Sequence, residues 1–448
     1  MYDNQDTDDC DIAVIGGGPV GSTAAALLAE KGYRVSLFEM AEHPRFHIGE
    51  SLLPMNLPIL ERLGVIDRVR EIGLIKHGAE FNAFDPKTDR WRRQTFRFAR
   101  ALDCRYPYAY EVRRSEFDTL LFENALGKGV RAICPAQVTN VAFTAPARVR
   151  LDYKTARGTQ SLQARYVVDA TGRSALLSRR LGLREKNPHH QSSAIFGHFA
   201  GVERRDGDDE GNISIYWFEH GWFWLIPLRD GTMSVGAVCW PEYLRSRQGS
   251  TEDFLWQTIR MNPGVADRMR AAHCLGEVRA TGNFSYTSSR MWGPDFLLLG
   301  DAFAFVDPVF SSGVYLGMSG AEQAVEVIDR VLREPGLRDR ECARFERRMR
   351  AAIGEMCWFI YRFTSPSMRQ LFMHPRNHWQ IEAAVISLLA GDIYDNPAVK
   401  RRLRMFRVIY YLRAATMLPG MSRAWLRRRR NAGVRFDAGT MAEDAEAG

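Results

Sequence analysis

The part of the sequence that most constrains the fold is residues 11–39, which reads DIAVIGGGPVGSTAAALLAEKGYRVSLFE. It opens with the apolar run Ile12 to Ile15, which is long enough for a buried parallel strand. A G-x-G-x-x-G turn follows, and its glycines and the proline between them are Gly16, Gly18, Pro19 and Gly21. An alanine-rich helical segment then ends at Gly32, before a second apolar run. This order predicts the strand, turn, helix and second strand of a dinucleotide-binding unit.

Each part of this unit has a physical role in binding a dinucleotide. The first glycine allows a tight turn, the second lets the backbone approach a pyrophosphate, and the third lets the helix pack against the sheet. The helix N-terminus directs free N–H groups and the positive end of its dipole at the phosphates. Glu39 ends the second strand, where its carboxylate can accept hydrogen bonds from a ribose diol. The unit alone does not distinguish NAD from FAD.

Length and composition favour a cytoplasmic protein with several domains. The chain has 448 residues, 46% of them hydrophobic, which allows two or three large cores. Its seven cysteines are scattered without a C-x-x-C pair, which argues against a disulfide framework and a metal site and favours a reducing compartment. The acidic N-terminus is unlike a signal peptide, and no window reaches the ~18 uninterrupted apolar residues of a membrane-spanning helix.

The net charge of +8 comes from one segment near the C-terminus. Residues 400–430 hold one Lys, ten Arg and no acidic residue, so the rest of the chain is slightly acidic. A basic surface spread over the fold, as in a nucleic-acid-binding protein, is therefore not expected. The segment could dock an acidic carrier protein, lie peripherally on an anionic membrane, or be a solvated helix whose arginines cover the core. Residues 437–448 are predicted to be a disordered acidic tail.

Three further motifs indicate which dinucleotide is bound. They are Arg114-Ser115-Glu116-Phe117-Asp118, Asp169-Ala170-Thr171-Gly172, and Gly300-Asp301-Ala302 followed by Asp307-Pro308. An Asp after a buried strand and a glycine can hold ribityl or ribose hydroxyls, and a Pro before a Gly-containing helix start can bring N–H groups to the flavin edge. With the first unit, these motifs resemble the FAD-dependent aromatic hydroxylase group over roughly residues 10–340.

This resemblance implies an α/β fold with a Rossmann-like FAD-binding domain, an antiparallel β-sheet substrate domain and a helical C-terminal region. The FAD-binding domain is expected from residues 1–75, 106–182 and 281–342, the substrate domain from residues 76–105 and 183–280, and the C-terminal region from residues 343–448. Residues 90–105, rich in arginine and aromatic residues, are expected to form an exposed excursion. The residues expected to bind FAD are Gly16, Gly18, Pro19, Gly21, Glu39, Arg45, Ser51, Arg114, Val138, Asp169, Gly172, Asp301, Pro308, Gly313 and Val314.

Two other motifs narrow the resemblance to the flavin-dependent halogenases. Residues 221–227 read GWFWLIP and contain W-x-W-x-I-P, and Lys76-His77-Gly78 contains K-x-G. Together with Gly49-Glu50-Ser51 they are similar to the halogenase pattern, whereas aromatic hydroxylases with the same FAD motifs generally lack both. Residues 308–313 read PVFSSG, a form that looks like the halogenases of phenols, pyrroles and carrier-tethered aryl groups.

The resemblance implies a reaction in which reduced FAD and O2 convert chloride or bromide to hypohalous acid. The acid then travels to a lysine, here Lys76, which either forms a haloamine or hydrogen-bonds the acid and directs it to the substrate. Burial of this lysine would lower its pKa and ease the loss of its proton. Trp222 and Trp224 share one strand face and are expected to keep the substrate from the flavin. The halide is expected at the N–H groups of Ser312 and Gly313.

One departure from the tryptophan halogenases concerns the substrate. They carry a glutamate two residues before the halide-site Ser or Thr, where this chain has Phe310, so free tryptophan is not the expected substrate. A phenolic, pyrrolic or aryl-acyl substrate of secondary metabolism, free or on an acyl or peptidyl carrier protein, is electron-rich and needs less help from a base. Glu80, His77 and a solvent path all remain open as the proton acceptor.

The remaining expectation concerns the source of reduced FAD. The chain has no second G-x-G-x-x-G to hold NADPH, so a separate flavin reductase is the expected partner. Two other readings stay open. One is an FAD-dependent aromatic monooxygenase or an oxidoreductase like the isoprenoid-lipid reductases, and the other is a catalytically silent FAD-binding partner of a biosynthetic complex.

Overall fold

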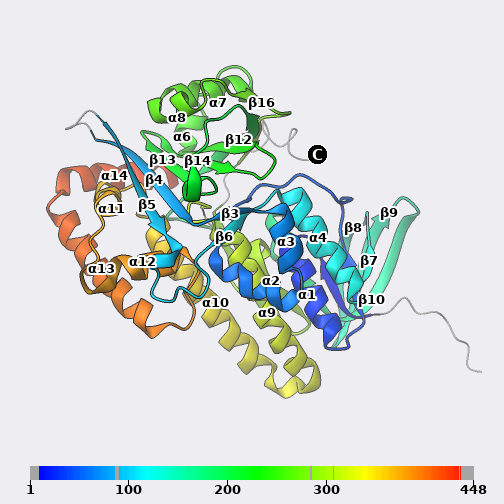
Figure 1. Cartoon of the computed structure of the whole chain (residues 1–448). Helices are drawn as coiled ribbons and strands as arrows, with labels where there is room; N and C mark the ends of the chain where they lie inside the picture. Colours follow the sequence, from blue (N-terminus) through cyan, green and yellow to red (C-terminus); the bar gives the residue numbers. More distant parts are fainter. Residues whose placement is uncertain (1–9, 86–89, 283–284, 306, 433, 435–448) are drawn as a thin grey trace, which may run out of the picture.

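The computed structural model of the chain describes residues 10–85, 90–282, 285–305, 307–432 and 434. Two large β-sheets form the centre of the molecule, and Figure 1 shows helices beside each of them. The predicted acidic tail at residues 437–448 lies outside the described residues. The mixed arrangement of sheets and helices confirms the predicted α/β fold.

The first large sheet contains the predicted dinucleotide-binding unit. Its strands run in the order β19-β20-β10-β1-β2-β7, with the bounds Trp292–Gly293, Phe296–Leu298, Gly158–Asp169, Cys10–Ile15, Val35–Phe38 and Arg131–Ile133 in that order. β1 is parallel to both β2 and β10, and β10 is parallel to β20. A hairpin of β8 (Gln137–Ala145) and β9 (Arg148–Thr155) pairs with β10 in antiparallel orientation.

The parallel strands bring the predicted FAD motifs to one edge of this sheet. β1, β10 and β20 end just before Gly16, Ala170 and Gly300, and carboxyl ends of neighbouring parallel strands lie together. Helix α1 (Pro19–Glu30) packs against both α4 (Arg114–Gly127) and α9 (Ser312–Arg333). The shorter helices of this part are α2 (Leu57–Leu63), α3 (Ile66–Ile72) and α5 (Leu176–Arg180).

The second large sheet is antiparallel except for the β13–β4 pair. Its order is β16-β12-β15-β14-β13-β4-β5, with the bounds His273–Cys274, Ser193–Ala200, Met233–Cys239, Gly221–Pro227, Ile213–Phe218, Gly78–Asp85 and Arg90–Arg97, and β17 (Arg279–Thr281) pairs with β12. Helices α6 (Pro241–Leu244), α7 (Thr251–Arg260) and α8 (Pro263–Arg268) lie beside it (Figure 1).

The prediction that residues 90–105 form an exposed excursion was wrong. The first half of this segment is β5, which pairs with β4 from Arg90 opposite Asp85 to Arg97 opposite Gly78. Phe96 and Phe98 are buried, while the arginines of the strand lie on both of its faces. The arginine content hides the strand because it interrupts the alternation of apolar and polar residues that marks a half-buried strand.

The remaining strands of the described residues form two small sheets. β3 (Leu74–Lys76) pairs with β6 (Ala109–Glu111), and β11 (Arg184–Lys186) pairs with β18 (Tyr286–Ser288), which also pairs with β21 (Ala304–Phe305). β3 directly precedes β4, so the β3–β6 pair lies where the chain passes from the first part to the second sheet.

The C-terminal region is helical, as predicted. Its helices are α10 (Arg338–Ile360), α11 (Pro366–Met373), α12 (Ile381–Leu389), α13 (Pro397–Ala415) and α14 (Leu418–Ala432), drawn from yellow to red in Figure 1. α11 contacts β4 and β5. One continuous apolar core joins the first sheet to these helices, and a second lies between the other sheet and α7 and α8. None of the helices in the described ranges is long and apolar enough to cross a membrane.

Candidate active site

The glycine-rich turn after β1 has no room for side chains. Gly16 has a φ of +106°, and a Cβ there would lie 2.3 Å from the carbonyl oxygen of Ala170. A Cβ on Gly21 would lie 1.8 Å from the carbonyl oxygen of Gly16. Gly18 precedes α1, and no side chain caps this helix start. The turn therefore leaves the first N–H groups of α1 available, as a pyrophosphate requires.

Glu39 and Arg45 lie together at the end of β2. The Glu39 carboxylate accepts hydrogen bonds from the backbone N–H of Gly17 at 2.7 Å and of Ala41 at 3.0 Å. The Arg45 guanidinium lies 3.5 Å from both Glu39 and Asp118. The buried Arg45 Nε has no hydrogen-bond partner within the described part of the chain. A carboxylate fixed by N–H groups beside a cation with a spare donor fits the adenosine diphosphate end of FAD.

Arg114 and Asp301 flank the expected position of the rest of the cofactor. Arg114 is buried, forks onto Asp118 at 2.7 and 2.9 Å, and donates to the carbonyl of Ile48 at 2.8 Å. Asp301 is half-buried after β20. Burial raises the pKa of Asp301 to about 6, against the opposing effects of Arg173 and Arg114. Its carboxylate is suited to ribityl hydroxyls once ionised.

Three of the residues predicted to bind FAD make their contacts within the chain. The Asp169 carboxylate is fully buried and accepts hydrogen bonds from Thr171 N at 3.0 Å, Thr171 Oγ1 at 2.6 Å and Leu177 N at 2.7 Å. It therefore closes the turn that carries Gly172. Val138 is buried in β8 opposite Tyr153. Ser51 faces Lys76 instead of the glycine-rich turn.

The predicted halide loop ends in a helix start without a side-chain cap. Ser311 adopts a left-handed φ of +56°, which is strained for a residue with a Cβ, and α9 begins at Ser312. Gly313 is exposed, with open space where a Cβ would lie. The N–H groups of Ser312, Gly313 and Val314 thus form the kind of site that binds a small anion. Pro308, two residues before Phe310, is half-buried at the head of this loop.

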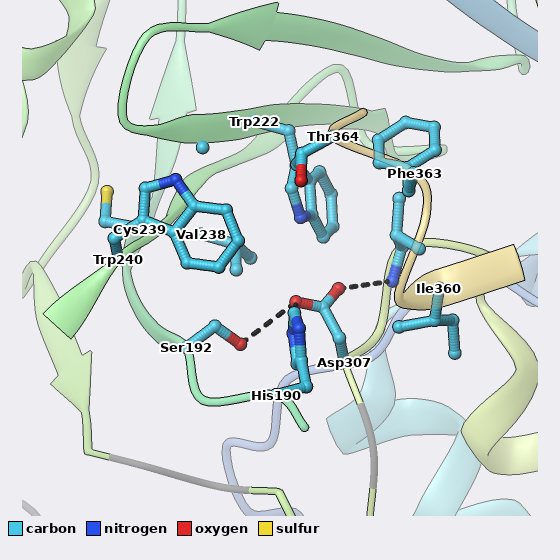
Figure 2. A pocket seen from close by; sticks show the side chains of 12 residues that line it. His190, Ser192, Trp222, Val238, Cys239, Trp240, Asp307, Ile360, Phe363 and Thr364 are labelled. Atoms are coloured by element: carbon cyan, nitrogen blue, oxygen red, sulfur yellow. Dashed lines mark hydrogen bonds and ion pairs between the residues drawn. The ribbon is translucent and has the colours of Figure 1, made fainter. Parts of the chain in front are cut away.

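Trp222 and Trp224 lie on one face of β14, as their spacing predicts. Their ring centroids are 6.0 Å apart, and Trp224 Nε1 donates to Ser234 Oγ at 3.2 Å. Trp222 also lines a cavity of about 10 Å³, room for about one water molecule, together with His190 and Asp307 (Figure 2). The first tryptophan of the motif therefore lies beside the loop that leads to the halide site.

His190 and Ser192 hold this loop through Asp307. His190 Nε2 lies 3.0 Å from Asp307 Oδ2, and Ser192 Oγ donates to the same oxygen at 3.0 Å (Figure 2). Val309 N donates to the other carboxylate oxygen at 3.2 Å. His190 could not be assigned a role from the sequence, because its contact with Asp307 joins segments more than a hundred residues apart.

Lys76 lies at the end of β3 with only 1% of its surface exposed. Its Nζ donates to Ser51 Oγ at 2.6 Å and to the carbonyl of Leu52 at 3.1 Å. It lies 3.8 Å from Glu111 Oε1 and 5.5 Å from the centre of the Phe98 ring. Burial lowers the pKa of this lysine, although Glu111 opposes the shift. Burial therefore shelters this amine from water and makes its neutral form more accessible.

Glu111 is a site residue that sequence reasoning missed. It is fully buried in β6, and burial raises its pKa to about 7 while Lys76 and Ser51 act in the opposite direction. Glu50, also fully buried, lies 2.8 Å from His198 Nε2. The available signal was an acidic residue inside the apolar run YAYEV at residues 108–112.

Of the two side chains left open as the proton acceptor, Glu80 is engaged elsewhere and His77 is the chain neighbour of Lys76. The Glu80 carboxylate accepts hydrogen bonds from Arg205 Nε and Ser214 Oγ, both at 3.0 Å, and lies 3.5 Å from Arg93. It is therefore committed to ion pairs of the second sheet. His77 is half-buried, and its carbonyl accepts a hydrogen bond from Phe98 N. Glu111, whose Oε1 lies 3.8 Å from Lys76 Nζ, is therefore the acidic group placed beside the amine.

Comparison with known proteins shows the family of the chain. The model of the tryptophan halogenase family matches residues 11–104 and 95–372. The chain is 29% identical over 420 residues to the 1H-pyrrole-2-carbonyl-[peptidyl-carrier protein] chlorinase of Pseudomonas fluorescens, covering 90% of this chain and 93% of that enzyme.

Solved structures of flavoproteins share the fold of this chain. The myxobacterial chondrochloren halogenase CndH, a FAD-dependent halogenase, is 33% identical with a TM-score of 0.75 over 85% of this chain and 90% of that chain. A flavoprotein/dehydrogenase from Cytophaga hutchinsonii is 26% identical with a TM-score of 0.82 over 91% of this chain and all of that chain. The monooxygenase and lipid-reductase alternatives are not favoured by the family match. Enzymes of this kind use reduced FAD, a halide ion and O2, and these are the cofactors of this chain. The chain belongs to the tryptophan halogenase family of FAD-dependent halogenating enzymes.

Proposed function

We propose that this enzyme halogenates an electron-rich phenolic or pyrrolic ring and that Lys76 directs the halogen to it. The observation that carries the proposal is the buried Lys76 amine, held by Ser51 and Leu52 and sheltered by Phe98. Reduced FAD, when bound, supplies with O2 the two-electron oxidation of chloride or bromide to hypohalous acid. The glycine-rich turn, Glu39, Arg45, Arg114 and Asp301 would hold this cofactor, and the start of α9 would hold the halide.

The chain's own groups direct the halogen from that point. Two hydrogen bonds fix the Lys76 amine, and its third N–H bond, or the lone pair left when it loses a proton, would meet the hypohalous acid. The bond between halogen and oxygen breaks as the carbon–halogen bond forms, and the ring proton leaves with the hydroxide as water. Glu111, with a pKa near neutrality, can accept or return the lysine proton during this exchange. Trp222 and Trp224 form a rigid wall that separates substrate from flavin.

The chemistry of the substrate follows from what the site lacks. Phe310, where tryptophan halogenases have a glutamate, is buried and packs 5.5 Å from Phe363 in an aromatic cluster. A ring activated by its own hydroxyl or ring nitrogen suits a site without that base. The 29% identical relative acts on a pyrrole held by a peptidyl carrier protein, which supports a carrier-tethered aryl group here. A separate flavin reductase in the cytoplasm would supply reduced FAD.

The test of this function is product analysis with candidate substrates. The purified chain would receive FAD, a flavin reductase, NADH, O2 and bromide with pyrrole-2-carbonyl and 4-hydroxybenzoyl groups, each free and as carrier thioesters. Mass spectrometry should find the isotope doublet of bromine on one of them. A hydroxylated product without halogen would indicate a monooxygenase and contradict the proposal.

Affinity for FAD is expected to depend on the ionisation of Asp301. Below its pKa of about 6 the carboxyl is protonated, and above it the carboxylate accepts hydrogen bonds from ribityl hydroxyls more strongly. Binding of FAD favours the charged form, so the dissociation constant should fall as pH rises from about 5 to about 7 and then level off. Fluorescence titration should find weaker, pH-independent binding in Asp301→Asn. The same slope in both proteins would contradict this role.

We also propose that the exposed side of α13 and α14 rests on an anionic membrane. This outer face is defined by large apolar side chains and exposed arginines: Val408, Tyr411, Leu412, Leu418, Trp425, Leu426, Arg401, Arg404 and Arg429. Leu412 is 66% and Leu426 58% exposed, although the opposite side of α13 already packs on the core through Leu403 and Phe406. A second copy of the chain would bring arginines against arginines. Anionic lipid satisfies both the charge and the apolar surface.

Vesicle flotation tests this contact. The chain should float with vesicles containing phosphatidylglycerol, bind phosphatidylcholine vesicles weakly, and be released by salt. Replacing Leu412 and Leu426 with Glu should lower binding at least about tenfold, because two inserted leucines are lost. Leu126→Glu with Leu275→Glu is the matched control, since these leucines are exposed elsewhere. Equal binding to neutral vesicles, or loss of carrier-protein binding in place of vesicle binding, would overturn the membrane assignment.

A further inference from the structure

An open pocket of about 450 Å³ lies between β5, the end of α11 and the start of α12. Its charged lining consists of three arginines, one histidine and one glutamate: Arg92, Arg100, Arg376, His374 and Glu382. A polar pocket of this size with an excess of positive charge suits an anionic ligand larger than a simple ion.

The arginines of this pocket differ in how they are paired. Arg100 is committed, because its guanidinium lies 3.1 and 3.3 Å from the two carboxylate oxygens of Glu382. Arg92 Nη1 lies 3.5 Å from His374 Nε2. Among the described residues, neither Arg92 nor Arg376 forms an ion pair with a carboxylate, and both are exposed. The guanidinium of Arg376 and the remaining N–H groups of Arg92 are therefore available to an anion.

The positive charge of Arg92 and Arg376 also acts on His374. Burial, and then the neighbouring Arg92, lower its pKa, while Asp85 opposes and Arg376 adds to the shift. The only carboxylate that lines the pocket, as far as the structure describes it, is Glu382, which is already held by Arg100. An anion entering the pocket would relieve the repulsion between the unpaired cations.

The pocket adjoins the segment that covers Lys76. Phe98 is 1% exposed, its ring lies 5.5 Å from Lys76 Nζ, and Arg100 follows it in the same turn. Leu102 N donates to Ser387 Oγ at 2.9 Å, which ties this segment to α12. A ligand held by Arg92 and Arg376 would thus lie outside the wall that separates solvent from the reactive amine.

We propose that this pocket binds the phosphate of a phosphopantetheine arm, so that the tethered aryl group reaches Lys76 past Phe98. The inference rests on the proposed halogenation of a tethered substrate. The phosphate ester is the one fully ionised group of such an arm, and the flexible pantetheine chain beyond it is neutral. Paired arginines select the phosphate, and the position of the pocket sets where the acyl end lies.

Calorimetry on the FAD-loaded protein tests the site without turnover. The probes are 4′-phosphopantetheine, pantetheine without the phosphate, and AMP as an unrelated phosphate ester. The wild-type chain should bind phosphopantetheine at least about tenfold more tightly than pantetheine, the effect of one or two charge-assisted hydrogen bonds to the phosphate. It should also bind phosphopantetheine more tightly than AMP, which carries the phosphate without the pantetheine chain. Replacing Arg92 and Arg376 with Gln should remove this preference.

The control variant is Arg148→Gln with Arg157→Gln, which removes the same charge from exposed positions at the β8–β9 and β9–β10 turns. It should keep the preference of the wild-type chain. Equal affinities for phosphopantetheine and pantetheine, absence of binding, a preference retained in Arg92→Gln with Arg376→Gln, or equally tight binding of AMP would each overturn the assignment. A chain that shows the preference but halogenates no ring would keep this site and refute the proposed function, whereas the reverse result would refute only this site.

Discussion

Lys76→Ala is expected to lower halogenation of the true substrate by about 10²–10⁴-fold, the usual range for a positioned proton-transfer group. The amine is the cation held by Ser51 and Leu52 within this closed site, and alanine supplies neither a donor nor a nucleophile. Formation of hypohalous acid should continue at the wild-type rate, because the cofactor and halide sites lie on other segments. Product formation measured by mass spectrometry, beside trapping of free hypohalous acid by a reporter phenol, separates the two steps.

The buried surroundings of Lys76 call for a control of stability. Lys76→Met keeps the length of the side chain and removes a charge that is 1% exposed, so it should fold at least as well as Lys76→Ala while showing the same loss of halogenation. Thermal unfolding of both variants would identify any fraction lost to misfolding. If either variant halogenated the substrate as fast as the wild-type chain, the role given to this lysine would be wrong.

Gly21→Ala is expected to destabilise the chain by about 3 kcal/mol and to weaken FAD binding by about 100-fold, the equivalent of that free energy. The new Cβ would lie 1.8 Å from the carbonyl oxygen of Gly16, so α1 must move away from the turn. That movement displaces the free N–H groups that face the pyrophosphate. Denaturant unfolding and fluorescence titration of FAD measure the two effects.

Gly127→Ala is the matched control for this substitution. Gly127 is the last residue of α4, has no heavy atom within 4 Å of an added Cβ, and does not have a left-handed φ. It should leave FAD affinity unchanged and raise helix stability by at most about 1 kcal/mol. Wild-type FAD binding by Gly21→Ala would show that the close approach to Gly16 is not needed for the cofactor site.

The FAD anchor could be predicted because its determinants are local in the sequence. Apolar runs of strand length, glycines at fixed spacing and an acidic strand end each act within a few residues, and the parallel order of β1, β2, β10 and β20 follows. Lys76 and Trp222 were predicted from two short motifs, K-x-G and W-x-W-x-I-P, that resemble those of the flavin-dependent halogenases. Their positions agree with that expectation, while their catalytic roles remain proposals.

The parts that sequence reasoning missed depend on contacts between distant segments. The pairing of Lys76 with Glu111 forms only when β3 meets β6, and nothing near Lys76 in the sequence indicates an acid. The contact of His190 with Asp307 is of the same kind. β5 was missed for a different reason, since its arginines obscure the alternation of a half-buried strand.

The continuous core of the first sheet has a consequence for modular engineering. Ile12 and Ala24 of the FAD-binding unit belong to the same apolar cluster as Phe345, Phe359 and Phe406 of the C-terminal helices. Exchange of this helical region between relatives, a direct way to graft a new specificity, would therefore cut through shared packing instead of a linker. The separate core lies only between the second sheet and α7 and α8, so a seam beside those two helices would disturb less shared packing.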